Sequence, residues 1–161
     1  MPQARGIAAS VQDGYGAFRQ PKVECGCCKM HVFRVGGVRQ NLYVFNLYRN
    51  PALDDRIFDC PQTSMAAVQA DDVRATFLSV GDLNGYHQQW FVSTTTNRHG
   101  AAAFDLATVS GCGQLVAGQT HSHSRTLDLL MTDVPDLGRV SLVKPIDNSD
   151  HSSLSAIISM D

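Results

Sequence analysis

The sequence predicts a layered α/β sandwich in which two mainly antiparallel β-sheets are flanked by outer helices. Short β-prone apolar runs outnumber helical segments, and helices separate only some of these runs. The chain has 161 residues, of which 43% are hydrophobic and 17% charged, as in an ordinary globular protein. We therefore expect one domain over residues 1–161.

The first strands are expected near the N-terminus. Residues 6–11 form a short β-prone run that ends at Asp13-Gly14. Residues 30–35 and 42–48 are two longer runs on either side of Gly36-Gly37. Because glycine readily adopts the positive φ angles of tight turns, this pattern predicts a β-hairpin.

A helix is expected next. Asn50 suits the cap position and Pro51 the first turn, so the helix would start there and continue to about Ala70. Pro61 lies inside that span, and proline removes a helical hydrogen bond, so we expect a kink or a break at this residue.

The second half of the chain predicts mostly strands. A buried strand is expected at residues 75–80, and a short helix from Gly100 to about Ser110, ended by Gly111. Four further strands are expected at residues 114–117, 126–132, 139–143 and 154–159.

Polar residues follow the strand at 75–80. In Gly81-Asp82-Leu83-Asn84, Asp82 and Asn84 share one face of the extended chain, while Leu83 points into the core. A carboxylate beside a carboxamide suits a site that holds a divalent cation and orients a water or phosphate oxygen. The alternative is a plain turn, which Asp and Asn favour.

Two acidic motifs lie downstream. Asp128 stands near the start of the run 126–132, and Ser149-Asp150-His151 comes directly before the last apolar run. His151 suits an acid, a base or a transition-state partner because imidazole carries a proton near neutral pH. Asp128 could bind the other ring nitrogen of His151 and so fix the tautomer of the imidazole. Alternatively, His151 is an ordinary surface residue.

These three motifs together resemble the endonuclease/exonuclease/phosphatase superfamily, which has the DNase I-like fold. Within it, the chain is most similar to the endonuclease domain of non-LTR retrotransposon reverse transcriptases. The resemblance covers roughly residues 40–160 well and residues 1–40 loosely. Further matching features are Gly85-Tyr86-His87 followed by Trp90, Asn97-Arg98-His99-Gly100, and Thr120.

The resemblance implies a DNA endonuclease, that is, a phosphodiester hydrolase dependent on Mg²⁺ or Mn²⁺. It implies that Asp82 and Asn84 orient the attacking water and contact the phosphate, and that Asp150 and Asp82 bind the metal. His151 would act on the phosphate with Asp128 behind it. Tyr48 would also touch the phosphate, although a half-buried strand aromatic is an equal alternative.

Three further residues are also expected near the site, on weaker grounds. Arg49 would add a phosphate contact or, as the preferred alternative, be an exposed residue at a helix start. His87 and Trp90 would lie beside the site, but a single tryptophan more often belongs to a core. We expect Asp82, Asn84, Asp128, Asp150 and His151 to converge at one edge of the sandwich.

The chain departs from the family at its start. The family opens with a strand bearing an Asn and then a strand bearing a Glu, the principal metal ligand, and neither motif is present. The one glutamate, Glu24, stands in a different context. We therefore expect an N-terminally incomplete domain that lacks the first strands, binds Mg²⁺ poorly and self-associates through the exposed edge strand at Gly6.

Three functions stay open. The first is a nuclease whose activity is weak or absent because the Glu is lost. The second is a catalytically silent remnant that binds nucleic acid or protein. The third is a phosphatase of the same superfamily. It is less favoured, because the Asn97–Gly100 and Gly81–His87 motifs resemble the retroelement endonucleases.

Charge and targeting signals limit the partners. The net charge is −2 and the 13 Lys and Arg residues are scattered, which argues against nucleic-acid binding by bulk electrostatics. A site metal would still supply local positive charge, so DNA is the expected partner, with a reverse transcriptase domain if the chain belongs to a longer polyprotein. No membrane-length apolar run or signal-peptide core is visible, so we expect an intracellular protein, cytoplasmic or nuclear.

Five cysteines complete the survey. Their odd number without a secretion signal favours reduced, mostly buried thiols. Cys25-Gly26-Cys27-Cys28 suggests zinc, but no second matching pair exists, and His121 and His123 lie far away in sequence.

Overall fold

The described part of the protein is built from one six-stranded mixed sheet, a second two-stranded sheet and two α-helices. The computed structural model describes residues 10, 16–25, 29–50, 58–90, 93–122, 125–134 and 139–158. The larger sheet has the order β1-β2-β3-β4-β6-β5, and β7 pairs with β8. The strands are β1 (Ala17–Arg19), β2 (Lys29–Gly36), β3 (Asn41–Tyr48), β4 (Ala75–Asp82), β5 (Gly113–Gln114), β6 (Asp128–Thr132), β7 (Val140–Val143) and β8 (Ser153–Ala156), and the helices are α1 (Asp59–Asp71) and α2 (Arg98–Val109).

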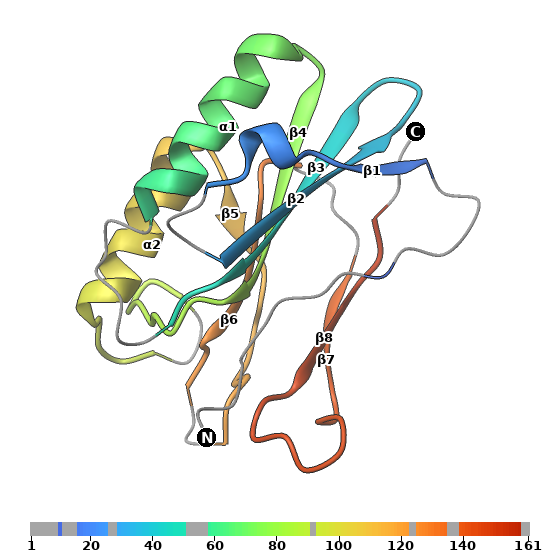
Figure 1. Cartoon of the computed structure of the whole chain (residues 1–161). Coiled ribbons are helices and arrows are strands. Elements are labelled where there is room, and N and C mark those ends of the chain that lie inside the picture. The colour runs from blue at the N-terminus through green and yellow to red at the C-terminus, as the bar shows by residue number, and fades with distance from the viewer. Residues whose placement is uncertain are drawn as a thin grey trace, which may run out of the picture.

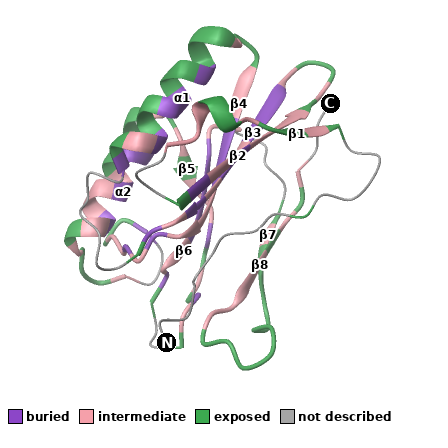
Figure 2. Ribbon diagram, in the orientation of Figure 1, coloured by how far each residue is buried: buried purple, intermediate pink, exposed green. Residues whose placement is uncertain are grey.

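The three layers enclose two apolar cores. Helices α1 and α2 cover one face of the larger sheet, and β7–β8 lies on the other side (Figure 1). Phe45, Phe77 and Leu129 pack toward the helices, whereas Leu78 and Leu130 belong to the core on the β7–β8 side. Neighbouring residues alternate between the two cores because successive side chains of a strand point to opposite faces. The burial pattern follows this, since buried residues are concentrated in the larger sheet and the inner helix faces (Figure 2).

The predicted hairpin is present. β2 and β3 pair antiparallel from Lys29 opposite Tyr48 to Gly36 opposite Asn41. Gly36 therefore still belongs to the ladder, and the connection is the four residues 37–40, in which the Gly37 N–H donates to the Gln40 carbonyl at 2.9 Å. The turn was expected at Gly36-Gly37, but Gly36 belongs to β2 and the turn lies at residues 37–40.

Helix α1 begins later than predicted. The predicted start at Pro51 falls among residues 51–57, which lie outside the described residues. In the described part, α1 starts at Asp59, so Pro61 occupies its first turn, where a missing N–H breaks no helical hydrogen bond. The predicted kink at Pro61 was wrong for this reason. Neither α1 nor α2 has the length and apolar character required to cross a membrane.

The remaining strands match the predicted positions with changed ends. β4 continues two residues beyond the prediction, through Gly81 and Asp82, and β5 has only two residues. β1 was not predicted. The predicted strand at 6–11 lies outside the described residues except for one position, so the expected exposed edge stays a prediction.

Two of the described cysteines lie in direct contact. The Sγ atoms of Cys25 and Cys60 are 2.6 Å apart, and the expectation of reduced thiols stays a prediction. This pair connects the segment before β2 to the first turn of α1. Cys112 is free, and burial, together with the charge of Asp133, raises the pKa of its thiol to about 12. Cys27 and Cys28 lie outside the described residues, so the zinc alternative is not tested there.

Gly81 is the position in β4 that tolerates no side chain. Its φ is +149°, and a Cβ atom would stand 1.7 Å from the Leu47 carbonyl oxygen of β3. We expect Gly81→Ala to lower the free energy of unfolding by about 3 kcal/mol, because both the conformation and the contact become unfavourable. Urea denaturation measures the change. Gly113→Ala is the control, since no heavy atom lies within 4 Å of its Cβ position; equal effects of both changes would contradict this account.

Glu24 stabilises the start of the sheet through Arg19 and the β2 backbone. Its carboxylate accepts hydrogen bonds from Arg19 Nε at 2.9 Å, Arg19 Nη2 at 2.8 Å and the Val32 N–H at 3.0 Å. The Arg19 hydrogen bonds lower the pKa of Glu24, although burial opposes them. A lowered carboxyl pKa means that this stabilisation exists above the pKa of the unfolded chain and is lost as the pH falls through the folded one.

We expect Glu24→Gln to cost about 1 kcal/mol at pH 7, a small value because Arg19 is half exposed. The difference from wild type should shrink as the carboxyl group becomes protonated, below about pH 4. Urea denaturation at a series of pH values checks this. A difference that stays constant down to strongly acidic pH would show that the charge of Glu24 contributes nothing.

Candidate functional site

The site starts from a row of three residues across the larger sheet. Tyr48 of β3 pairs with Asp82 of β4, and Asp82 pairs with Asp128 of β6. Directly paired residues of a sheet project to the same face. Leu78 of β4 and Leu130 of β6 project to that face too, and both pack in the core under β7–β8. The two carboxylates therefore lie side by side on the face that the two-stranded sheet covers.

The connection between β7 and β8 brings the histidine to this row. His151 and Asp150 precede β8, and the Nδ1 atom of His151 lies 2.7 Å from Asp128 Oδ2. This matches the hydrogen-bond distance expected for these two side chains. Asp150 is 66% exposed, with one carboxylate oxygen 4.0 Å from His151 Nε2. The structure thus brings together the five polar residues that were expected at one edge of the sandwich.

The acidic side chains of the site shift the pKa values of Asp82 and His151. Burial and then the charge of Asp128 raise the pKa of Asp82. Burial acts to lower the pKa of His151, but the hydrogen bond and charge of Asp128, with the charges of Asp82 and Asp150, outweigh it and raise that pKa. The site therefore favours a protonated imidazole and is unfavourable for two bare carboxylates. A cation bound near Asp82 would relieve the repulsion between the Asp82 and Asp128 carboxylates.

Asn84 follows Asp82 in a tight turn that is tied to the site. Its N–H donates to Asp82 Oδ1 at 3.0 Å, and its side-chain Nδ2 donates to the Arg49 carbonyl at 3.0 Å. Its φ is +49°, a conformation that asparagine tolerates. The turn interpretation of Asp82-Leu83-Asn84 is therefore confirmed, the site interpretation stays a prediction, and Leu83 is buried in the core as predicted.

The segments that carry Asn84 and Asn97 are hydrogen-bonded to each other. Asn97 caps α2 by accepting from the Gly100 N–H at 2.7 Å, and the same oxygen accepts from the Tyr86 N–H at 3.1 Å. Its Nδ2 donates to the Asn84 carbonyl at 3.3 Å. A Cβ on Gly100 would stand 1.9 Å from the Tyr86 oxygen, so glycine permits this close contact. The start of α2 thereby fixes the loop that carries Asn84.

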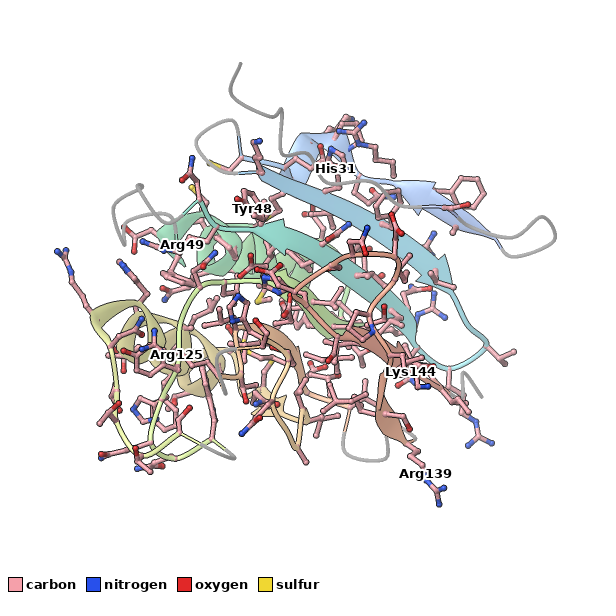
Figure 3. The ribbon with its side chains drawn as sticks, turned by 90° about the horizontal axis from the view of Figure 1, so that it is seen from below. His31, Tyr48, Arg49, Arg125, Arg139 and Lys144 are labelled. Carbon is pink, nitrogen blue, oxygen red and sulfur yellow. The ribbon has the colours of Figure 1, made fainter. Side chains whose placement is uncertain are left out.

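Arg49 is buried, contrary to the expectation of an exposed residue. Its exposed fraction is 1%, and its Nη2 lies 2.9 Å from His99 Nε2 in α2. Its backbone N–H also donates to the Asp82 carbonyl at 2.9 Å. Tyr48 is half-buried beside it, with the Lys29 Nζ 5.5 Å from its ring centre. Figure 3 shows Tyr48 and Arg49 next to each other at this end of the molecule.

His87 and Trp90 pack against α2 instead of facing Asp82. The His87 ring stacks on Phe104 with 4.1 Å between ring centres, and the Trp90 ring lies 6.1 Å from that of Phe104. Trp90 is 8% exposed and belongs to the core under the helices. The core alternative for Trp90 was correct, and neither ring lies on the carboxylate face.

Thr120 organises the site although the sequence assigned it no role. Its hydroxyl oxygen accepts from the N–H groups of Leu127 at 2.9 Å and Asp128 at 3.0 Å, and its carbonyl accepts from the Ser152 N–H at 2.8 Å. It therefore connects the start of β6 to the segment that carries His151. The residue is fully buried.

His121 is a second residue that sequence reasoning missed. Its Nε2 lies 3.2 Å from Asp150 Oδ2, and its ring centre is 4.8 Å from that of His151. The backbones of His121 and His151 are bridged. The sequence motif His121-Ser122-His123 was visible, but its distance along the chain from His151 hid the contact.

Comparisons with known proteins bear on the fold. No protein-family model matches the chain, and no curated protein matches it. Among solved structures, the endonuclease domain of TRAS1, a telomere-specific non-LTR retrotransposon, is similar with a TM-score of 0.70. The similarity covers 91% of this chain and 68% of that chain at 14% sequence identity. The DNase I-like fold predicted from the sequence is therefore confirmed.

The buried hydroxyl of Thr120 gives a testable prediction. In Thr120→Val, the N–H groups of Leu127 and Asp128 lose their acceptor inside the protein, so we expect a loss of about 2–3 kcal/mol in unfolding free energy. Urea denaturation measures it, and Thr95→Val at an exposed position is the matched control. Equal stability of the Thr120 variant and wild type would show that the hydroxyl does not organise β6.

Proposed function

We propose that the protein is a divalent-metal-dependent phosphodiester hydrolase, a DNA endonuclease of the retroelement type, with weak activity. The observation that carries the proposal is the contact between His151 Nδ1 and Asp128 Oδ2 at 2.7 Å, directly beside Asp82. A histidine oriented by one carboxylate and next to a second, buried carboxylate is a suitable arrangement for hydrolysis of a charged ester.

His151 and Asp128 have complementary tasks in this proposal. Asp128 holds Nδ1, so Nε2 of His151 is the ring atom available to a phosphate oxygen. The raised pKa of His151 keeps the imidazole protonated over a wider pH range, so it can donate to the phosphate and stabilise charge that develops in the transition state. Asp128 keeps the tautomer and orientation of the ring.

Asp82 and Asn84 would act on the water and the phosphate. Asp82 lies beside Asp128 and has a raised pKa, which favours a group that accepts a proton from an attacking water. Asn84 is fixed through Arg49 and Asn97, so its position relative to Asp82 is set by the backbone. Tyr48 is the neighbour of Asp82 across the strand pair and would contact the phosphate from β3.

The donor set of the site fits Mg²⁺ or Mn²⁺ in part. Two carboxylates stand side by side at Asp82 and Asp128, and burial, followed by the charge of Asp128, raises the pKa of Asp82. Carboxylate oxygens are ligands that Mg²⁺ prefers. Asp82 and the exposed Asp150 would hold the ion. When bound, the ion would polarise the phosphate and lower the pKa of a water molecule.

The absent glutamate argues for weak activity. Glu24, the one glutamate of the chain, uses its carboxylate for Arg19 and the Val32 N–H and is therefore committed to the start of β2. It does not replace the ligand that the resemblance places on an earlier strand. The second candidate function, a silent module that binds nucleic acid, rests on this loss. A reverse transcriptase domain as a covalent neighbour belongs to the same proposal.

A plasmid-nicking assay tests the proposal. We expect slow nicking with Mg²⁺ or Mn²⁺, none with EDTA, and a rate about 10²–10⁴-fold lower in His151→Ala because the acid is lost. His31→Ala, a histidine of β2 that packs on Phe33, is the matched control and should nick at the wild-type rate.

Two outcomes would contradict the proposal. Nicking that survives His151→Ala unchanged would come from a contaminating nuclease. No nicking with either ion would leave the silent module, and binding of a DNA duplex measured by fluorescence anisotropy would then decide whether the chain contacts nucleic acid at all.

A further inference from the structure

Three metal-ligating side chains gather at the outer edge of the site. His121 Nε2, a carboxylate oxygen of Asp150 and a ring nitrogen of His151 all lie within 4.8 Å of one another. They come from two segments that are 29 residues apart along the chain but run side by side through the bridge between His121 and His151. Ser122 and Ser152 reinforce this pairing, because their N–H groups donate to the carbonyls of Asp150 and Thr120.

The ligand set is chemically distinct from the carboxylate pair of Asp82 and Asp128. Two imidazoles and one carboxylate are donors that Zn²⁺ prefers, whereas Mg²⁺ prefers oxygen ligands alone. His151 is oriented for this role, since Asp128 takes its Nδ1 and turns Nε2 toward Asp150. A carboxylate behind a ligating histidine is the arrangement that fixes the tautomer at zinc sites.

We propose that His121, Asp150 and His151 form a binding site for Zn²⁺, with water in the fourth position. The pair His121 Nε2 and Asp150 Oδ2, at 3.2 Å, already has about the 3.4 Å separation of two ligands on a tetrahedral zinc ion. The pair His151 Nε2 and Asp150 Oδ1 is wider, at 4.0 Å. Asp150 is exposed, so rotation of its carboxylate can bring Oδ1 closer to His151 Nε2 without disturbing a packed core.

Zinc at this position would compete with catalysis. It would occupy Nε2 of His151, the atom that contacts the phosphate in the proposed function, and would also take Asp150 from the Mg²⁺ site. Zn²⁺ is therefore an inhibitor of nicking, a consequence that rests on the proposed function. The binding site itself does not depend on any nuclease activity.

The experiment measures metal binding directly. Zn²⁺ affinity is obtained by competition with a chromophoric chelator, and Co²⁺ serves as a spectroscopic substitute through its visible absorption. Accessible thiols are first blocked with N-ethylmaleimide, because the cysteines are an alternative zinc ligand set. We expect one zinc ion per chain, and a Co²⁺ spectrum without the charge-transfer band of a thiolate.

Variants identify the ligands. His121→Asn and Asp150→Asn should each lower the Zn²⁺ affinity at least about tenfold, because each removes a ligand. His31→Asn is the matched control and should bind zinc like wild type, since His31 lies on β2, which β3 and β4 separate from β6 and the residues next to it. Thermal melting in EDTA verifies that all variants fold equally well, which matters most for His121 because its side chain is 15% exposed, against 66% for Asp150.

Several outcomes would overturn the site. These are no zinc binding by the thiol-blocked wild type, an affinity that His121→Asn leaves unchanged, or a thiolate band in the Co²⁺ spectrum. The two proposals fail separately. A chain that binds zinc through His121 but nicks no DNA disproves the nuclease and leaves the metal site, and a chain that nicks DNA but ignores zinc does the reverse.

Discussion

The register of β3, β4 and β6 is the constraint on which the rest of the structure depends. Tyr48, Asp82 and Asp128 form a row because β3 and β4 run parallel and β4 and β6 antiparallel, with their ends aligned. A shift of β4 by one residue would turn Asp82 toward the helices and expose Leu83. Gly81 fixes this register from the side of β3, because its close contact with the Leu47 carbonyl leaves no room for another residue.

The second layer completes the site from above this row. β7 and β8 have four residues each and bury little of their surface, yet the connection between them carries Asp150 and His151. This small sheet is attached to the larger one by apolar contacts such as those of Val140 and Leu154, and by the hydrogen bonds of Thr120. Asp128–His151 is thus one of several polar contacts between two layers that also meet through apolar side chains.

Local sequence patterns were sufficient to predict much of the fold and of the site. Strand positions could be predicted because apolar β-prone runs end at polar or glycine residues, and Asp82, Asp128 and His151 stand where such runs begin or end. Their contacts could be anticipated only through the resemblance to a family. Thr120 was not recognised as a partner of Asp128 and Ser152, nor His121 as a partner of His151, since these relations depend on contacts between distant segments. Arg49 was misjudged because its burial comes from α2, which packs over it from fifty residues away.

The six-stranded sheet and the β7–β8 sheet differ in the extent of their ladders and cores, and this difference determines which part of the site opens first. The six-stranded sheet is held by long ladders and by a core under two helices, whereas β7–β8 has one short ladder of its own. Opening of such a peripheral unit needs less free energy than global unfolding, and amide hydrogen exchange reports the difference. The amides of β8 should therefore exchange ahead of those in β3 and β4, so that His151 leaves Asp128 in molecules whose main sheet is still intact. The contact between the two acidic strand ends and their histidine can then break without unfolding of the main sheet.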